Sequence, residues 1–237
     1  MDKASFMNNL DLSVALATAP SSAFSELRER PKFWFPLLLL IASTVAIVYW
    51  YYSVVDIEWL KDAMFSNNPD IQRLPEAERA ARMALFGRNT LLWTSVVGTI
   101  VILPIVFLLS ALYLLLAAKV TKLSQGFKHW FALSSWSALP LLLNTVVAAI
   151  FLILSDNSQV SPSVMQPLSI NELLLHRPYG SAGHTLLESL HVPGALSWIL
   201  MIIGVRTWSQ RSWTFSAIFI LLPIVVLYGI WSAFAFG

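Results

Sequence analysis

The chain has 237 residues, of which 57% are hydrophobic and only 12% are charged, and its mean hydropathy is +0.69. A soluble domain of this size cannot cover so much apolar surface, so most of the chain is expected to lie in lipid. The formal net charge of +2 is small and dispersed, which argues against a nucleic-acid partner. Cysteine is absent, and this excludes a disulfide framework, a thiolate metal site and a cysteine nucleophile.

Residues 1–32 are predicted to form a cytoplasmic N-terminal segment. The segment lacks an uninterrupted apolar core and mixes charges of both signs, so we expect no secretory signal peptide there. After Pro20, the apolar residues Ala23, Phe24 and Leu27 recur at helical spacing between polar and charged residues. This pattern predicts a short amphipathic, interfacial helix that lies in the headgroup region before the first span.

Residues 33–237 are predicted to form one membrane domain with five transmembrane helices. A helix needs about 17–25 apolar residues to cross a bilayer. The predicted spans are residues 33–55, 91–118, 131–154, 190–207 and 214–236. The apolar run of the fourth span is short, and it reaches full length only if its helix begins near Leu186, before His191 and Pro193. The fold class is therefore an all-α membrane protein.

Basic residues indicate which ends of the spans face the cytoplasm. The short loops Lys119–His129 and Arg206–Arg211 contain lysine or arginine and no acidic residue. Short cytoplasmic loops of multi-pass proteins have this bias. We therefore expect the N-terminus inside and the C-terminus outside. Two longer, partly helical loops, Asp56–Thr90 and Ser155–Pro193, would then be extracytoplasmic.

The sharpest group of polar residues lies in the second extracytoplasmic loop. His184, Glu188 and His191 follow one another at spacings of four and three, which would place them on one face of a helix. Two imidazoles and a carboxylate on one face can bind a divalent metal ion, and His176 lies nearby, four residues after Glu172. The alternative is that these side chains line the wet face of an interfacial helix. The spacing differs from the HExxH motif of zinc proteases.

The spans contain few residues that could support chemistry. No Asp or Glu lies inside the four longer runs, which argues against a proton relay or a cation-coupled transporter. Asn144 is the most polar residue at depth, and Ser135 and Ser137 precede it. These residues are predicted either to bond and pack between helices or to line a polar pathway. Gly-rich nucleotide loops and a GxSxG nucleophile are absent, so we expect neither enzymatic activity nor an organic cofactor.

Three features of the chain occur together in one family of membrane proteins. One is the five-span arrangement with the N-terminus inside. The second is the segment PSSAFSELRERPKFWFP before the first span, and the third is the stretch GFKHWFALSSWSALPLLLN, where a Phe precedes a small and polar helix start and a Leu-Pro. The residues that match these motifs are Pro20, Phe24, Leu27, Pro31, Pro36, Phe127, Ser135, Ala138, Leu139 and Pro140. Through these features the chain resembles the Yip family, the Ypt/Rab-interacting membrane proteins and their bacterial relatives.

The resemblance implies a polytopic membrane protein whose eukaryotic relatives are linked to Rab GTPases, vesicle trafficking and membrane shaping. The acidic cytoplasmic tail associated with Rab binding is not evident here, so a bacterial-type member in the inner membrane is implied. We expect a non-enzymatic scaffold that organises the lipid bilayer or binds a protein partner, as a homo-oligomer such as a dimer. The alternative is a transporter or channel for a small solute or metal ion that uses the polar third span. A third hypothesis is an enzyme that acts on lipid.

Overall fold

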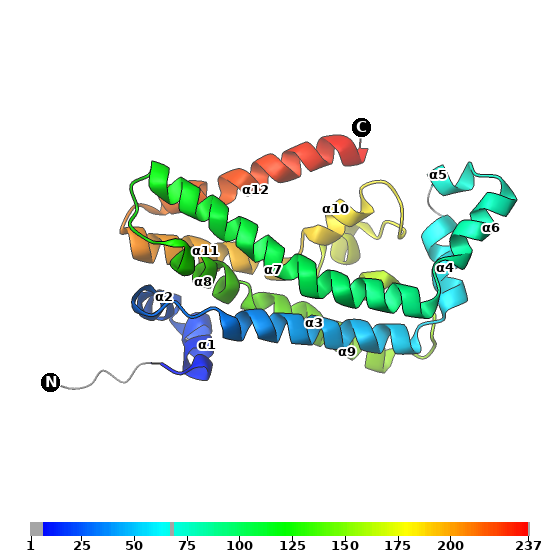
Figure 1. Ribbon diagram of the computed structural model, residues 1–237, viewed down its shortest axis with the longest axis horizontal. Coiled ribbons are helices and arrows are strands. Elements are labelled where there is room, and N and C mark those ends of the chain that lie inside the picture. Colours follow the sequence, from blue (N-terminus) through cyan, green and yellow to red (C-terminus); the bar gives the residue numbers. More distant parts are fainter. Residues whose placement is uncertain (1–6, 67–68, 237) are drawn as a thin grey trace. The chain divides into compact units, whose positions relative to one another are not determined.

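The computed structural model describes residues 7–66 and 69–236, which form helices joined by turns and loops (Figure 1). The chain divides into two compact units. Unit 1 comprises Met1–Leu40, Pro104–Pro140 and Leu196–Val226, and unit 2 comprises Ile41–Leu103, Leu141–Ala195 and Leu227–Gly237. Every long apolar helix contributes residues to both units.

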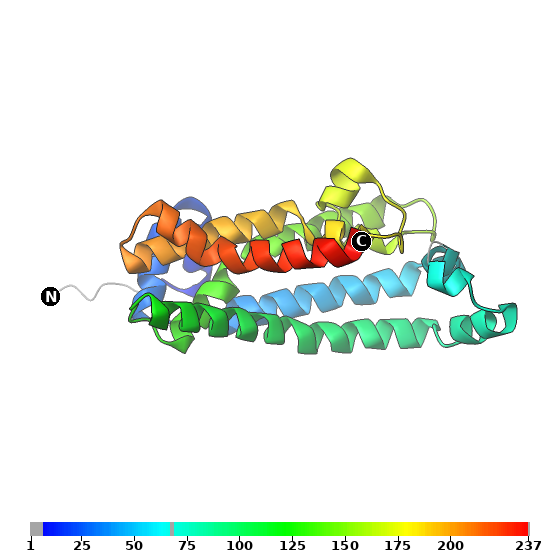
Figure 2. The ribbon, with the colours of Figure 1, turned by 90° about the horizontal axis from the view of Figure 1, so that it is seen from above.

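Five helical runs in the described part of the chain are long and apolar enough to cross a membrane, which confirms the all-α, five-span fold. They are α3 (Trp34–Val54), α7 (Arg88–Val120), the run Phe127–Leu154 from α8 (Phe127–Ser137) to α9 (Leu142–Leu154), α11 (Val192–Ser209) and α12 (Trp213–Phe236). Pro104 lies inside α7 and Pro223 inside α12, and both helices continue through them (Figure 2).

The fourth span is long enough without the residues that precede His191. Helix α11 begins at Val192 and has 18 residues, so a start near Leu186 is not needed. Pro193 lies in the first turn, where a residue without an N–H removes no intrahelical hydrogen bond.

Two short helices of unit 1, α1 (Asn9–Thr18) and α2 (Pro20–Glu29), precede the first span. Helix α2 is the amphipathic helix expected from the sequence, and Pro20 occupies its first position. Helix α1 was not expected. It begins with a capping box in which the Asn8 side chain accepts the Asp11 N–H and the Asp11 side chain accepts the Asn8 N–H.

The apolar face of α2 is buried inside unit 1. Phe24 and Leu27 have no exposed surface, so this face contacts protein. The Trp208 indole N–H donates to the Phe24 carbonyl at 2.6 Å, and the two rings meet edge to face. Gly204 of α11 leaves the room for this contact, because a Cβ there would lie 3.2 Å from the Phe24 ring and would collide with Leu133 of α8.

The third span is interrupted in the middle. Its helix begins at Phe127, four residues before the expected start and inside the expected cytoplasmic loop. Pro140 lies in a 3-10 turn, η1 (Leu139–Leu141), between α8 and α9. On α8, Ser134 and Ser135 are buried, and each hydroxyl donates to the carbonyl four residues earlier, at 3.0 and 2.8 Å. These serines thus allow close packing of α8 without leaving a donor unpaired.

The buried core of unit 2 combines span residues with the connector between the first two spans. Its members are Ile47, Tyr51, Val55, Ile57, Leu60, Leu91, Ala148 and Leu152. The connector forms α4 (Ile57–Ser66), α5 (Pro69–Gln72) and α6 (Glu76–Ala84). The Tyr51 hydroxyl donates to the Val160 carbonyl at 2.8 Å, which fixes the start of the second long loop against α3.

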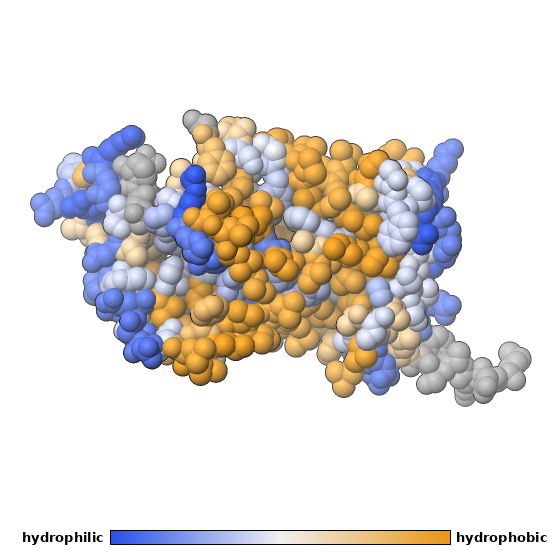
Figure 3. Space-filling model, turned by 180° about the vertical axis from the view of Figure 1, so that it is seen from behind, coloured by the Kyte–Doolittle hydropathy of each residue, from blue (hydrophilic) through white to orange (hydrophobic). Residues whose placement is uncertain are grey.

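Large apolar side chains remain exposed along the long helices. Figure 3 shows hydrophobic residues over much of the visible surface. Leu38, Val101, Leu109, Ile150 and Leu227 are examples of apolar residues of the long helices that are more than a third exposed. A soluble monomer rarely exposes so much apolar area, so these faces are suited to lipid, and the chain is a multi-pass membrane protein.

Candidate functional site

The second long loop, in unit 2, is folded and closed at its base. It contains the 3-10 turn η2 (Pro162–Met165), the π-helical turn η3 (Asn171–Leu175) and α10 (His184–Ser189). Ser169 and His191 form an isolated antiparallel bridge. The Ile170 N–H donates to the Leu190 carbonyl at 2.7 Å, and the Val192 N–H donates to the Leu168 carbonyl at 3.0 Å. The two ends of the segment 168–192 are therefore hydrogen-bonded to each other, and we call this segment the closed loop.

This closed loop brings three potential metal ligands together. Glu172 of η3 and the pair His184 and Glu188 of α10 each offer one ligand atom, and the three atoms lie within 4.8 Å of one another. His184 and Glu188 are one helical turn apart, as their spacing predicts. Glu172 comes from a different element, so tertiary folding creates the group. We name these three residues the carboxylate–histidine cluster.

His184 is the most buried member, with 2% of its surface exposed. Its Nε2 atom is 3.2 Å from the Ser163 hydroxyl, within hydrogen-bond distance, and 3.5 Å from Glu188 Oε1. The Tyr179 ring packs against the imidazole at a centroid distance of 5.2 Å. The Tyr179 ring thus packs against the imidazole, and the Nε2 atom faces the oxygens of Ser163 and Glu188.

The two carboxylates of the cluster have no lysine or arginine partner among the described residues. No lysine or arginine in the described part of the chain forms a salt bridge with Glu172 or Glu188, and the buried Glu188 Oε1 makes no hydrogen bond. Burial raises the pKa of Glu188, and the Glu172 charge adds to the rise, while Ser163 and His184 act in the opposite direction. Burial, with the Glu188 charge, also raises the pKa of Tyr179.

The other two predicted ligands lie outside the cluster. α10 ends at Ser189 and Leu190 is extended, so His191 does not share a helical face with His184. His191 instead caps α11, where its Nδ1 accepts the Gly194 N–H at 2.9 Å, and burial lowers its pKa. His176 is exposed and has a left-handed backbone (φ 51°) directly after η3.

The polar residues of the third span are placed in two different units. In unit 2, the buried Asn144 donates through Nδ2 to Gln166 Oε1 at 2.7 Å. In unit 1, the Ser135 hydroxyl is bonded to the Phe131 carbonyl, and Ser137 is buried and its hydroxyl has no partner among the described residues. The interaction of Asn144 is with a loop residue, which the sequence did not indicate.

Unit 1 contains a polar pocket of about 290 Å³ that sequence reasoning did not identify. Its lining is Ser21, Ser25, Arg206, Thr207, Gln210 and Arg211. The Arg206 guanidinium lies over the Trp213 ring at 4.4 Å, and Arg211 lies over Phe215 at 4.5 Å and donates to the Thr121 carbonyl. The lining thus has two oriented guanidinium groups and no carboxylate, and we name it the arginine pocket.

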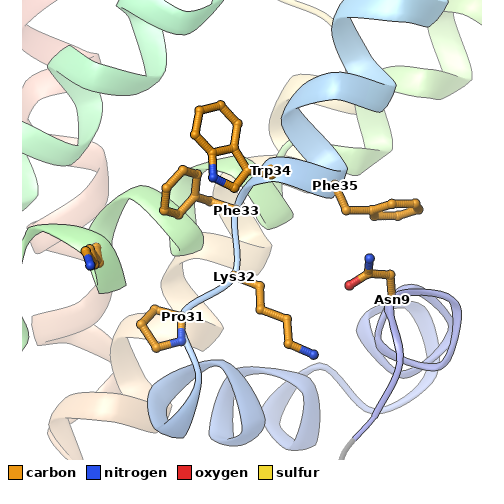
Figure 4. A pocket seen from close by; sticks show the side chains of 7 residues that line it. Asn9, Pro31, Lys32, Phe33, Trp34 and Phe35 are labelled. Atoms are coloured by element: carbon orange, nitrogen blue, oxygen red, sulfur yellow. The ribbon is translucent and has the colours of Figure 1, made fainter.

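A second pocket of unit 1, of about 460 Å³, lies where α1 meets the start of α3. Its lining is Asn9, Pro31, Lys32, Phe33, Trp34, Phe35 and Lys128. In Figure 4, Lys32 extends toward the Asn9 side of the pocket, and Phe33 and Trp34 lie on the other side of the chain. This lining, the lysine pocket, again combines two cations with aromatic rings and has no carboxylate.

Comparison with protein families decides what kind of membrane protein these features belong to. Residues 14–234, nearly the whole chain, match the family described as the Yip1 domain. The chain belongs to the Yip1 family. Neither the curated proteins nor the solved structures include a match.

The motif residues of this Yip1-family protein have structural positions that explain their types. Phe24 and Leu27 are the buried residues of α2, and Pro20 begins that helix. Pro36 is buried in the first turn of α3. Phe127 begins α8, and Pro140 lies in the interruption of the third span. These positions determine helix ends and contacts of unit 1, and none of them belongs to the carboxylate–histidine cluster.

Proposed function

We propose that this Yip1-family protein is a non-enzymatic scaffold of the bacterial inner membrane that organises lipid by binding anionic phosphate groups of lipid headgroups. The observation that supports the proposal is the pair of cationic pockets in unit 1. Each pocket has two basic side chains and no carboxylate in its lining. Guanidinium and ammonium groups are the usual partners of phosphate oxygens.

The chemistry around the pockets fits a membrane surface. Arg206, Arg211 and Lys128 belong to the stretches Arg206–Arg211 and Lys119–His129, which the positive-inside rule assigns to the cytoplasm, and this supports an N-inside orientation. Trp213 and Trp34 are more than half exposed beside the two pockets, as expected of indoles at headgroup level. Each basic residue near an anionic surface contributes about 1 kcal/mol of attraction.

The polar third span gives less support to the transporter alternative. Asn144 is bonded to Gln166, and Ser135 is bonded to its own helix. Neither of the two pockets described above is lined by Asn144, Ser135 or Ser137. A scaffold needs exposed apolar faces that can contact lipid or a second copy of the chain, and the long helices have such faces. A homodimer is the simplest assembly of this kind.

The proposal is tested by measuring lipid binding to the arginine pocket. The purified chain in neutral detergent is titrated with phosphatidylglycerol and with phosphatidylcholine, and bound lipids are counted by native mass spectrometry. We expect a preference for the anionic lipid that Arg206→Gln weakens about fivefold, since one such contact contributes about 1 kcal/mol. Lys119→Gln removes the same charge from the end of α7, outside both pockets, and should leave the preference unchanged.

Three results would contradict this function. Equal binding of both lipids by the native chain would remove the basis for a headgroup site. Solute flux in proteoliposomes that Asn144→Leu abolishes would favour the transporter instead. Retention of inorganic phosphate by the native chain, without retention of phosphatidylglycerol, would show that the pocket binds free phosphate and not a lipid headgroup.

A further inference from the structure

We propose that Glu172, His184 and Glu188 form a binding site for one divalent transition-metal ion, with Zn²⁺ as the ion that fits best. The site lies in the closed loop of unit 2 and is independent of the lipid-binding function proposed for unit 1. It retains His184 and Glu188 from the sequence pattern and replaces His191 and His176 with Glu172.

The first argument is the distance between the ligand atoms. Zn²⁺ binds imidazole nitrogen and carboxylate oxygen at about 2.0–2.2 Å in a tetrahedral arrangement, so two ligand atoms on one ion lie about 3.3–3.6 Å apart. The three atoms of the cluster lie within 4.8 Å of one another. His184 Nε2 and Glu188 Oε1, at 3.5 Å, already have the separation that a common ion gives. A side-chain movement of about 1 Å therefore brings Glu172 to the same ion.

The second argument is the charge of the cluster. Two carboxylates face each other and an imidazole without a lysine or arginine partner in the described residues. The buried Glu188 Oε1 has no hydrogen-bond donor, and leaving a carboxylate oxygen in that state is costly. A divalent cation would give both carboxylates a counter-charge and would use the free lone pair of Oε1.

The third argument is that neighbouring groups hold the ligands in place. Glu172 Oε1 accepts a hydrogen bond from the Asn171 side-chain Nδ2 at 2.8 Å, and the Glu172 backbone N–H donates to the Ser169 hydroxyl at 3.2 Å. Gly183, with φ +75°, lies against the Phe236 ring just before α10. In established metal sites, hydrogen bonds and packing from neighbouring residues orient the side chains that bind the metal.

The types of ligand in the cluster favour Zn²⁺ over Mg²⁺ and Ca²⁺. Mg²⁺ and Ca²⁺ prefer six or more oxygen ligands, and the cluster offers one nitrogen and two carboxylates. Zn²⁺ is bound by imidazole and carboxylate in combination, and three protein ligands leave a fourth position for water.

The test measures Zn²⁺ binding to the full chain in detergent, after removal of the purification tag and treatment with a chelator. Isothermal titration with Zn²⁺ at pH 7.5 should give about one ion per chain, and thermal unfolding should shift upward when Zn²⁺ is present. Glu188→Gln keeps the shape of the side chain and removes its charge, so it should weaken binding at least tenfold. His184→Asn should do the same.

Matched histidine variants show whether the site is the one proposed. His176→Gln and His129→Gln remove histidines outside the cluster and should leave affinity and stoichiometry unchanged. Absence of saturable Zn²⁺ binding by the native chain would overturn the proposal, and so would native affinity in Glu188→Gln. If a cluster variant unfolds, Co²⁺ absorption of the native chain decides: d–d bands of a nitrogen–oxygen site support the proposal, and their absence contradicts it. Loss of Zn²⁺ binding with intact lipid preference would leave the scaffold function standing.

Discussion

At the scale of single residues, His191 has two structural roles that its position explains. Its backbone pairs with Ser169 at the base of the closed loop, and its side chain caps the fourth span through the Gly194 N–H. Only the imidazole with an unprotonated Nδ1 can accept this hydrogen bond. Burial lowers the pKa of His191 below its usual value of 6.5, so the folded chain favours the neutral ring.

The stability of the protein should therefore depend on His191 at mildly acidic pH. Because the unfolded chain takes up the proton first, the contribution of His191 is complete above about pH 6.5 and is lost as the pH falls below it. Thermal unfolding in detergent between pH 8 and pH 5 measures this slope. His191→Asn should keep the cap and reduce the slope, and His191→Ala should lose about 1 kcal/mol even at pH 8. An unchanged slope in the Asn variant would contradict the assignment.

The cluster shows what spacing in a sequence can and cannot indicate about a site. The separation of four between His184 and Glu188 predicted their shared helical face correctly, because that contact is local. The same rule failed for His191, since α10 ends two residues earlier. Glu172 joins through the pairing of residues 168–170 with 190–192, and no local pattern reports such a long-range contact. The metal site itself stays a prediction.

At the scale of elements, unit 1 depends on a close approach between α2, α8 and α11. Gly204 is the residue of α11 at this approach, and Leu133 of α8 and Phe24 of α2 fill the space that a side chain would need. Both neighbours are fully buried, so neither can move without disturbing the packing.

Gly204→Ala should destabilise unit 1. The added methyl group meets Leu133 and Phe24, and overpacking of this kind costs about 1–3 kcal/mol. Gly229→Ala in α12 is the matched control, because nothing lies within 4 Å of the position where its Cβ would be. The control should be neutral or slightly stabilising, since alanine favours helix. Equal effects of the two changes on thermal unfolding would contradict the packing argument.

The elements were predictable to the extent that hydropathy determines them. Five apolar runs formed five helical spans in the described part of the chain, and Ala23, Phe24 and Leu27 became the buried face of α2. The start of the third span was predicted four residues too late, and because the helix begins at Phe127, Pro140 falls deep in the span and interrupts it. Helix α1 was not predicted, although Asn8 and Asp11 have the spacing of a capping box. Only Leu12 and Leu16 of this helix are buried, so the sequence has no extended apolar pattern that would indicate it.

At the scale of the whole molecule, composition and the family agree. The apolar surface requires a bilayer, and the match to the Yip1 domain covers residues 14–234. The orientation of the chain in that bilayer rests on the positive-inside rule and is open to direct measurement. The absence of cysteine makes the measurement simple, because any introduced thiol is then unique.

Single-cysteine labelling should give an N-inside orientation. Ser124 lies in the exposed turn between α7 and α8, and Ser158 lies in the exposed start of the second long loop. A maleimide that cannot cross membranes should label Ser158→Cys in intact spheroplasts and should label Ser124→Cys only after lysis. The reverse pattern would invert the assignment of the arginine pocket to the cytoplasm.

The bridge between Ser169 and His191 also determines how much conformational entropy the chain would lose if the closed loop were longer. Because the ends of the closed loop are already joined by hydrogen bonds, added residues at its tip would enlarge a loop whose closure cost grows only with the logarithm of its length. Gly180 is the exposed turn residue at that tip. The five spans of this chain can therefore stay as they are while the loop between the third and fourth spans is lengthened or shortened at its tip.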